Sequence, residues 1–316
     1  MPQLRPGPIS YSRSITLTLT HDCPWHCRYC GFRSDGEGLL SEDSLNTLLL
    51  SARQQRAREA LLISGEHPDQ LPHIKKELHA RGFTDFIDFA SYVARRALDS
   101  GLLPHGNYGA LNLEQLLRLR PTHVSMGLML ENIEDLPDIA PEKRSSGRLK
   151  TLTAAGQAKI AFTSGILIGL GESLESRFRS LDALARSHRE YGQLQEILIQ
   201  NFIPNHASSL PPDCPIPGLQ DYFDLISYWR EICPEVPIQI PPNLNPHWRE
   251  LLPYVDDLGG ISSHRDEVNP LNPWAPPQHY QDAAHAAARD LQERLPIYPS
   301  HHHSAWLDPA LIPMTF

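Results

Sequence analysis

Apolar and amphipathic stretches alternate along almost the whole chain. Leu61–Ser64, a short apolar run that ends at Gly65, is typical of a buried parallel strand. A helix is predicted over Glu42–Ala60, with Ser41 in position to cap its first turn. The predicted strands are Ile15–Thr20, Leu61–Ser64, Leu102–His105, His123–Leu130, Ile160–Leu170, Gln195–Phe202, Val236–Ile240 and Asp257–Ser262, and the last predicted helix is Ala283–Glu293. Eight strand–helix units predict a parallel sheet, and their number fits a closed (β/α)8 TIM-type barrel.

Length and composition agree with a globular α/β protein. The chain has 316 residues, of which 41% are hydrophobic and 21% charged, which is ample for a large core. We expect a single barrel domain over residues 1–316, with its core at about 14–295. The formal net charge is −9 and no run of Lys or Arg occurs, so nucleic acid is not an expected partner. Met1–Ser14 lacks an apolar signal core and no stretch of 18 apolar residues exists, so we expect a soluble cytoplasmic protein that does not bind membranes.

Three of the five cysteines follow the first predicted strand within eight residues, as Cys23-x3-Cys27-x2-Cys30. In a (β/α)8 barrel the chemistry lies at the carboxyl ends of the strands, which is where this loop falls. Three thiolates can hold a 4Fe–4S cluster and leave one iron open to a small molecule. A zinc site that adds His21 or His26 is the alternative reading of the spacing. Cys214 and Cys233 have no paired spacing and are expected to be structural.

The cysteine triplet, with Tyr29 before its last member, resembles the defining motif of the radical S-adenosylmethionine (SAM) superfamily, and the predicted barrel is of the kind found there. In that family the open iron chelates the amino and carboxylate groups of SAM. A guanidinium fork suits such a carboxylate. The resemblance implies these SAM contacts: Tyr29 at the adenine, Ser64-Gly65-Glu66 (Gly-Gly-Glu in the family) at the amino group, Glu131 at the ribose, Arg148 at the carboxylate, and Gly169 and Gly171 beside the adenine.

Longer motifs resemble the CofG-type subunits of 7,8-didemethyl-8-hydroxy-5-deazariboflavin (FO) synthases, over about Ile15 to Pro299. One departure lies between Glu131 and Arg148, where the chain is shorter than the family norm and lacks a His before Ala140-Pro141. The motifs are Leu103–Asn107, Ser125–Glu131, Phe162–Gly169, Gln195–Glu196, Ile199–Phe202, Pro241–Leu244, Gly259–Ser262 and Val268–Pro270.

This resemblance implies a radical cyclisation. The reduced cluster would cleave SAM to a 5′-deoxyadenosyl radical, which would take a hydrogen from an adduct of tyrosine and a ribityl-diaminouracil. Ring closure and loss of ammonia would then give FO, in a reaction of the carbon–nitrogen lyase type. The implied partners are a CofH-type subunit that makes the adduct and a ferredoxin- or flavodoxin-like reductant.

Polar residues at later strand ends are candidates for the substrate. Amide side chains can pair with both the donors and the acceptors of a uracil and with ribityl hydroxyls. We expect Gln200, Asn201, Asn243 and Ser262 to bind substrate, and His105 and Asn107 to act catalytically, with His105 as a proton carrier. Loop-capping amides and a core histidine are the competing interpretations.

Two other functions remain open at this point. One is a different radical SAM reaction on the same barrel, such as CofH-type coupling or the sulfur insertion of biotin synthase, which would require cysteines for a second cluster. The other is a zinc-stabilised barrel without radical chemistry.

Overall fold

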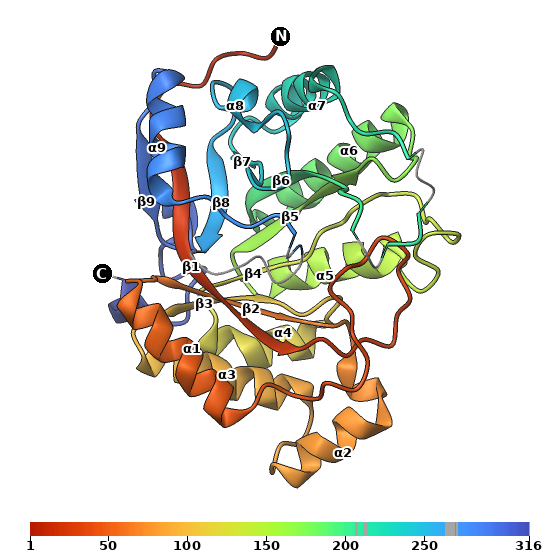
Figure 1. Ribbon diagram of the computed structural model, residues 1–316, viewed down its shortest axis with the longest axis vertical. Coiled ribbons are helices and arrows are strands. Elements are labelled where there is room, and N and C mark those ends of the chain that lie inside the picture. The colour runs from red at the N-terminus through yellow and green to blue at the C-terminus, as the bar shows by residue number, and fades with distance from the viewer. Residues whose placement is uncertain (206–207, 211–213, 263–268, 270, 316) are drawn as a thin grey trace.

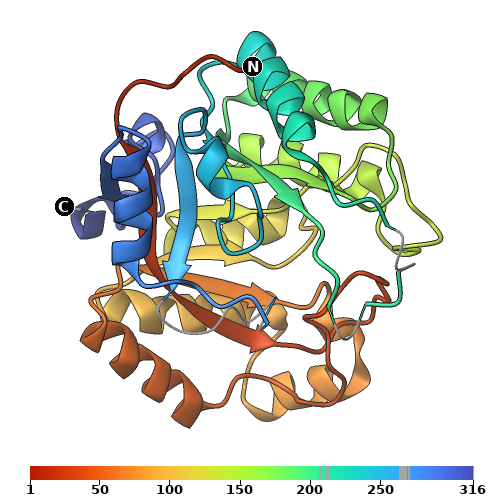
Figure 2. The ribbon, with the colours of Figure 1, turned by 45° about the horizontal axis from the view of Figure 1, so that its top comes forward.

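The computed structural model describes residues 1–205, 208–210, 214–262, 269 and 271–315. Eight parallel strands form a closed barrel, because β1 pairs with β2 on one edge and with β8 on the other (Figures 1 and 2). A ninth strand, β9, also pairs with β1. The strands are β1 (Ile9–Thr20), β2 (Glu59–Ser64), β3 (Leu103–Asn107), β4 (Ser125–Gly127), β5 (Phe162–Ile168), β6 (Leu194–Asn201), β7 (Ile238–Gln239), β8 (Asp257–Ser262) and β9 (Leu291–Arg294). The predicted barrel is confirmed.

Helices surround the ring of strands on the outside (Figure 2). Their apolar faces pack on the strands, and several begin at side-chain caps, including the predicted cap at Ser41, whose side chain accepts from the Ser44 amide. The α-helices are α1 (Glu42–Gln54), α2 (Pro72–Ala80), α3 (Phe86–Asp99), α4 (Leu113–Leu119), α5 (Ser145–Gln157), α6 (Leu174–Tyr191), α7 (Leu219–Ile232), α8 (Trp248–Leu251) and α9 (Pro277–Ala286).

Two predicted helices extend too far. The helix predicted over Glu42–Ala60 ends at Gln54, because Arg56 takes the left-handed conformation (φ 53°) and turns the chain into β2. The prediction of a helix over Ala283–Glu293 is wrong beyond Ala286: the chain turns at Ala288 (φ 55°) and becomes β9. Tertiary pairing with β1 outweighs the helical propensity of that segment.

Strand β9 and the residues after it form the floor of the barrel. Arg294 forms a two-pronged ion pair with Asp257, at 2.6 and 2.8 Å, and reaches Glu196 at 3.3 Å. The Tyr298 hydroxyl donates to Glu196, and the Pro296 carbonyl accepts from Ser125 Oγ. These contacts seal the amino-terminal end of the lumen with buried, mutually paired polar groups.

Part of one motif named above lies outside the described residues, namely residues 268 and 270 of Val268–Pro270. None of the described helices is both long and apolar enough to span a membrane.

Candidate active site

The loop after β1 carries the cysteine triplet and is fixed mainly by Asp22. The buried Asp22 carboxylate accepts hydrogen bonds from the amides of Gly36 and Gly38, at 2.6 and 2.7 Å, and pairs with His73 at 2.9 Å. Burial alone would raise the Asp22 pKa, but these bonds outweigh it and lower the pKa. Sequence reasoning missed Asp22, because only the folded loop brings its partners together.

The end of β2 approaches the cysteine loop closely enough to require glycine. A Cβ on Gly65 would lie 2.2 Å from the Asp22 carbonyl oxygen and 2.7 Å from Cys23 Cβ. The next amide, that of Glu66, donates to Cys23 Sγ at 3.4 Å. The Ser64 hydroxyl donates a hydrogen bond to the Gly65 carbonyl at 2.8 Å. The predicted Ser64-Gly65-Glu66 segment therefore lies directly against the first cysteine.

The arrangement of the three cysteines favours a cluster over zinc. The thiols of Cys23, Cys27 and Cys30 interact electrostatically, and burial raises the Cys27 pKa to about 12, so a bound metal of either kind would have to displace its proton. A zinc ion bound at about 2.3 Å would draw the sulfurs to roughly 3.8 Å from one another. Among the described residues, three candidate ligand atoms all come within 4.8 Å of one another only at His188, Cys233 and Glu235, so at least one pair of the three cysteine sulfurs lies farther apart than a zinc ion would draw them.

Both histidines of the alternative zinc set use Nδ1 for contacts other than the cysteines. His21 Nδ1 bonds to the Phe32 carbonyl at 2.8 Å, and the exposed His26 pairs with Glu142 at 3.3 Å. The side chains that the zinc interpretation needs are therefore engaged in holding the loop.

Loops after β4 and β6 border the cysteine loop, at the right of Figure 1. The Arg28 amide donates to the Ile139 carbonyl, and the Ser209 amide donates to the Arg28 carbonyl, both at 2.8 Å. Segments distant in sequence thus meet at the carboxyl ends of the strands, which is where barrel enzymes place their chemistry.

A buried network of four side chains lies beside Cys27. Glu131 Oε2 accepts from the Tyr29 hydroxyl at 2.5 Å. Its Oε1 accepts from Lys143 Nζ at 2.6 Å and from Arg148 Nη2 at 3.1 Å. Lys143 Nζ also donates to the Tyr29 hydroxyl at 2.7 Å. The structure therefore joins three residues that the sequence predicted separately, and adds Lys143, which it did not predict.

The network holds a fixed charge pattern. Burial alone would raise the Glu131 pKa, but Lys143 and Arg148 outweigh it and lower the pKa to about 2. Arg148 also approaches Glu66 Oε2 at 3.5 Å, while the Ala110 amide donates to Glu66 Oε1 at 2.9 Å. Two carboxylates and two cations are thus balanced at the end of the barrel.

Two of the hydrogen-bond donors of Arg148 are unpaired in the described part of the chain. Its side chain is only 6% exposed, yet Nε and Nη1 are buried with no hydrogen-bond partner among the described residues. Buried guanidinium donors without a partner are costly, and a carboxylate ligand would satisfy them. This observation fits the SAM carboxylate, as the sequence resemblance implied.

The loop after β5 uses glycine where its backbone turns. Gly169 and Gly171 have φ angles of 94° and 96°, which residues other than glycine rarely adopt. The amides of Gly169 and Leu170 donate to the Glu172 carboxylate at 2.8 and 2.7 Å. Glu172 in turn pairs with Arg177 at 2.7 Å, so the loop is held rigidly.

A lumen descends through the barrel from these loops to the floor. It is lined by Gln200, Asn243, His105 and Asn107, four of the predicted substrate or catalytic residues. Asn201 and Ser262, also predicted to bind substrate, do not line it. Asn201 Nδ2 instead donates to the Leu244 carbonyl at 2.9 Å, and Ser262 is buried at the end of β8, so we assign neither to the substrate.

His105 has a defined tautomer. Ser125 Oγ donates its one hydrogen to the Pro296 carbonyl at 2.6 Å, so it accepts from His105 Nδ1 at 2.7 Å. The Nε2 atom therefore carries the lone pair. Burial, with Arg294 and His123 nearby, lowers the His105 pKa to about 3. A neutral hydrogen-bond acceptor fits this environment better than the predicted proton carrier.

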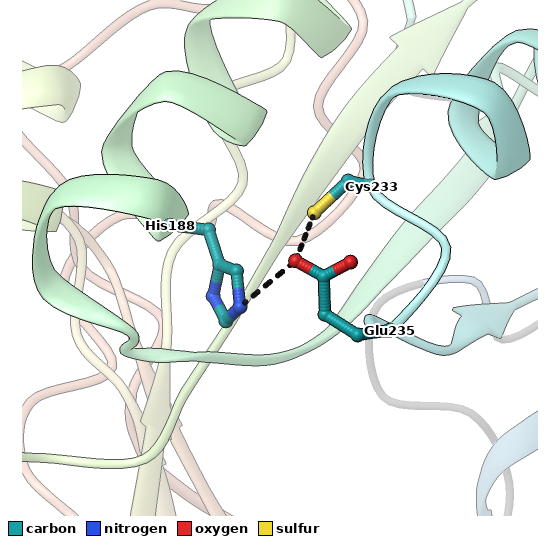
Figure 3. A group of neighbouring side chains, drawn as sticks. All are labelled: His188, Cys233 and Glu235. Carbon is teal, nitrogen blue, oxygen red and sulfur yellow. Dashed lines mark hydrogen bonds and ion pairs between the residues drawn. The ribbon is translucent and has the colours of Figure 1, made fainter.

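A second group of potential ligands lies outside the barrel, between α6 and the end of α7 (Figure 3). Cys233 Sγ donates to Glu235 Oε1 at 3.4 Å, and His188 Nε2 lies 3.7 Å from the same oxygen. The Leu194 amide donates to His188 Nδ1, so Nε2 carries the proton and has no lone pair for a metal. Burial also raises the Cys233 pKa to about 12. This group is structural, as expected for Cys233.

Comparison with known proteins identifies the family. A family model described as the radical SAM superfamily matches residues 17–184. The 7,8-didemethyl-8-hydroxy-5-deazariboflavin synthase of Archaeoglobus fulgidus is 38% identical over 97% of this chain and 95% of its own length. The synthase of the same name from Methanococcoides burtonii is 35% identical, over 94% and 92%.

Solved structures show the same fold. The FeFe-hydrogenase maturase HydG from Carboxydothermus hydrogenoformans is similar with a TM-score of 0.72 and 16% identity, over 98% of this chain and 71% of that one. Methylornithine synthase is similar with a TM-score of 0.65 and 15% identity, over 90% and 84%. At such identities the likeness concerns the barrel alone.

Proposed function

The chain belongs to the radical SAM superfamily and, within it, to the family of 7,8-didemethyl-8-hydroxy-5-deazariboflavin (FO) synthases, and from this premise we propose that it carries out the ring closure that completes FO. Membership makes it a radical SAM enzyme with a 4Fe–4S cluster and SAM as cofactors, acting on small molecules. The proposed substrate is the adduct of tyrosine and a ribityl-diaminouracil, made by a CofH-type subunit. Ammonia leaves as the third ring forms, and a ferredoxin- or flavodoxin-like protein supplies the electron.

One observation carries the proposal: the amide-lined lumen opens at the same strand ends as the cysteine loop and the unpaired donors of Arg148. When bound, the cluster and SAM supply a 5′-deoxyadenosyl radical. The protein's part is to hold both reactants in one geometry and to keep water away.

The residues around the cofactors have distinct tasks in this proposal. Cys23, Cys27 and Cys30 hold the cluster. Arg148 donates its unpaired N–H groups to the SAM carboxylate, and Glu66 accepts from the SAM amino group. Tyr29 and the Gly169–Gly171 loop provide the surface beside the adenine, and Glu131 lies toward the ribose.

The lumen residues bind the adduct. Gln200 and Asn243 donate to and accept from the uracil and ribityl groups, since each amide has both functions. His105, held by Ser125 as a neutral imidazole, presents Nε2 as an acceptor, and Asn107 lies next to it on β3. The buried floor ends the cavity and excludes solvent from that side.

A reconstitution experiment tests the proposal. With reductant and SAM, this chain is expected to convert the purified adduct to FO, with ammonia and 5′-deoxyadenosine as coproducts. From tyrosine and the ribityl-diaminouracil alone it should make no FO until a CofH-type subunit is added. Liquid chromatography with mass detection follows each species. FO made by this chain alone would contradict the division of labour, and adduct formation would indicate the coupling reaction instead.

A lumen variant tests the substrate contacts separately. Gln200→Met removes an amide from the cavity, and losing one hydrogen bond of about 0.5–1.5 kcal/mol should raise the KM for the adduct roughly two- to tenfold. Gln278→Met is the matched control, because Gln278 is exposed on α9. An unchanged KM in Gln200→Met would remove this residue from the substrate site.

A further inference from the structure

Lys143 belongs to the loop between β4 and α5, in the shortened segment between Glu131 and Arg148. Its side chain is 18% exposed, and Nζ lies 2.6 Å from Glu131 Oε1 and 2.7 Å from the Tyr29 hydroxyl. The ammonium also lies 5.2 Å from the centre of the Tyr29 ring. A lysine buried by three such contacts is held in one position.

The contacts of Lys143 limit how Arg148 can pair with Glu131. Glu131 Oε2 is occupied by the Tyr29 hydroxyl, and Lys143 and Arg148 share Oε1, with Lys143 the closer by distance. Arg148 therefore approaches Glu131 through one nitrogen, Nη2, and leaves Nε and Nη1 without partners.

Without Lys143 this balance would change. Glu131 would be a buried carboxylate with one cationic neighbour, and a guanidinium pairs with a carboxylate most strongly through two parallel N–H groups. Arg148 would turn its fork onto Glu131 and use the donors that are now unpaired. The ammonium of Lys143 prevents this, because it already neutralises the carboxylate.

We propose that Lys143 is a positioning residue for SAM: by pairing with Glu131 it keeps the Arg148 fork open for the carboxylate of the incoming cofactor. This inference rests on the proposed function only in placing SAM at Arg148. Lys143 acts through Arg148 and needs no contact with SAM itself.

Calorimetric titration of SAM into the reconstituted, oxidised holoenzyme tests the inference without turnover. Lys143→Met should weaken SAM binding by about tenfold, which is the lower end for losing a charge-assisted hydrogen bond. Lys143→Arg, which restores a positive charge, should recover most of the affinity. Lys150→Met is the matched control, because Lys150 is exposed on the adjacent helix α5, and it should bind like the parent protein.

A double-mutant cycle gives the decisive result. Because Lys143 is proposed to act through Arg148, Lys143→Met should add little further loss in the Arg148→Ala background. Additive losses would overturn the inference, as would unchanged affinity in Lys143→Met. Loss of iron from Lys143→Met would also overturn it, since Lys143 would then support the cysteine loop. FO formation by the parent protein tests the proposed function independently of all these outcomes.

Discussion

Replacing Arg294 with methionine is expected to destabilise the barrel from its floor. In the folded protein Arg294 is 11% exposed and makes two bonds of 2.6 and 2.8 Å to Asp257, which is fully buried. It also lies 3.3 Å from Glu196. Methionine keeps much of the side-chain length but leaves two buried carboxylates without their cation. Removing one partner of such a group costs about 3–5 kcal/mol, or roughly 6–20 °C in the melting temperature.

A more exposed ion pair on the same strand, β9, provides the control. Arg13 on β1 pairs with Glu293 on β9 at 2.6 Å, but both side chains are about one-third exposed (36% and 31%). Arg13→Met should therefore cost only about 0–1 kcal/mol. Both variants are compared with the parent by circular dichroism during thermal unfolding of the holoenzyme. Equal losses in the two variants would refute the argument that burial of the carboxylates sets the cost.

The loss of stability in Arg294→Met should also depend on pH. Burial raises the Glu196 pKa to about 7 already in the parent protein, where Arg294 opposes the shift. Removing Arg294 raises it further, so the folded variant binds protons that the unfolded chain releases. A folded state that binds more protons gains stability as pH falls. The difference in melting temperature between variant and parent should therefore be smaller at about pH 6 than at about pH 8. A larger difference at the lower pH would contradict the role given to Glu196.

Two further outcomes follow from the cysteine loop. Cys27→Ser should lose most of the bound iron and all FO formation while Cys233→Ser keeps both, as iron and sulfide quantification would show; full iron in Cys27→Ser would remove it from the ligand set. Gly65→Ala should lower cluster content, because its Cβ would lie 2.2 Å from the Asp22 carbonyl oxygen, whereas Gly147→Ala, with open space around its Cβ, should keep the cluster and stabilise α5 by up to about 1 kcal/mol. Equal iron in the two glycine variants would contradict the close-approach argument.

Much of the barrel could be predicted because its strands are short apolar runs and its helices are amphipathic. The bounds of β8 agree with the predicted strand Asp257–Ser262, an apolar segment with clear ends. The residues Leu291–Glu293 are predicted as helix, and Leu, Gln and Glu are indeed good helix formers. The pairing of Leu291–Arg294 with Ile9–Ser12 depends on a strand at the far end of the sequence, which no local pattern reveals.

The site divides in the same way. The cysteine spacing is a local signal, and Arg148 could be named from its motif. Lys143 and Asp22 stand in no comparable pattern, and their importance arises from neighbours that are brought together only by folding. The alternation of side chains along β6 likewise separates Gln200, which lines the lumen, from Asn201, which does not.

The pairing of β1 with β9 has a consequence for how the protein is made. The ribosome releases the cysteine loop early and the floor strand late, so a nascent chain carries its iron ligands on a barrel that is still open at the bottom. Until Pro296 arrives, the Ser125 hydroxyl lacks its acceptor and His105 has no fixed tautomer. A contact that joins both ends of the sequence also forms late in folding, because it requires the entropically costly closure of a very long loop. The lumen and the hydrogen-bonding state of His105 are therefore completed only after the last strand is made, long after the cysteine loop has left the ribosome.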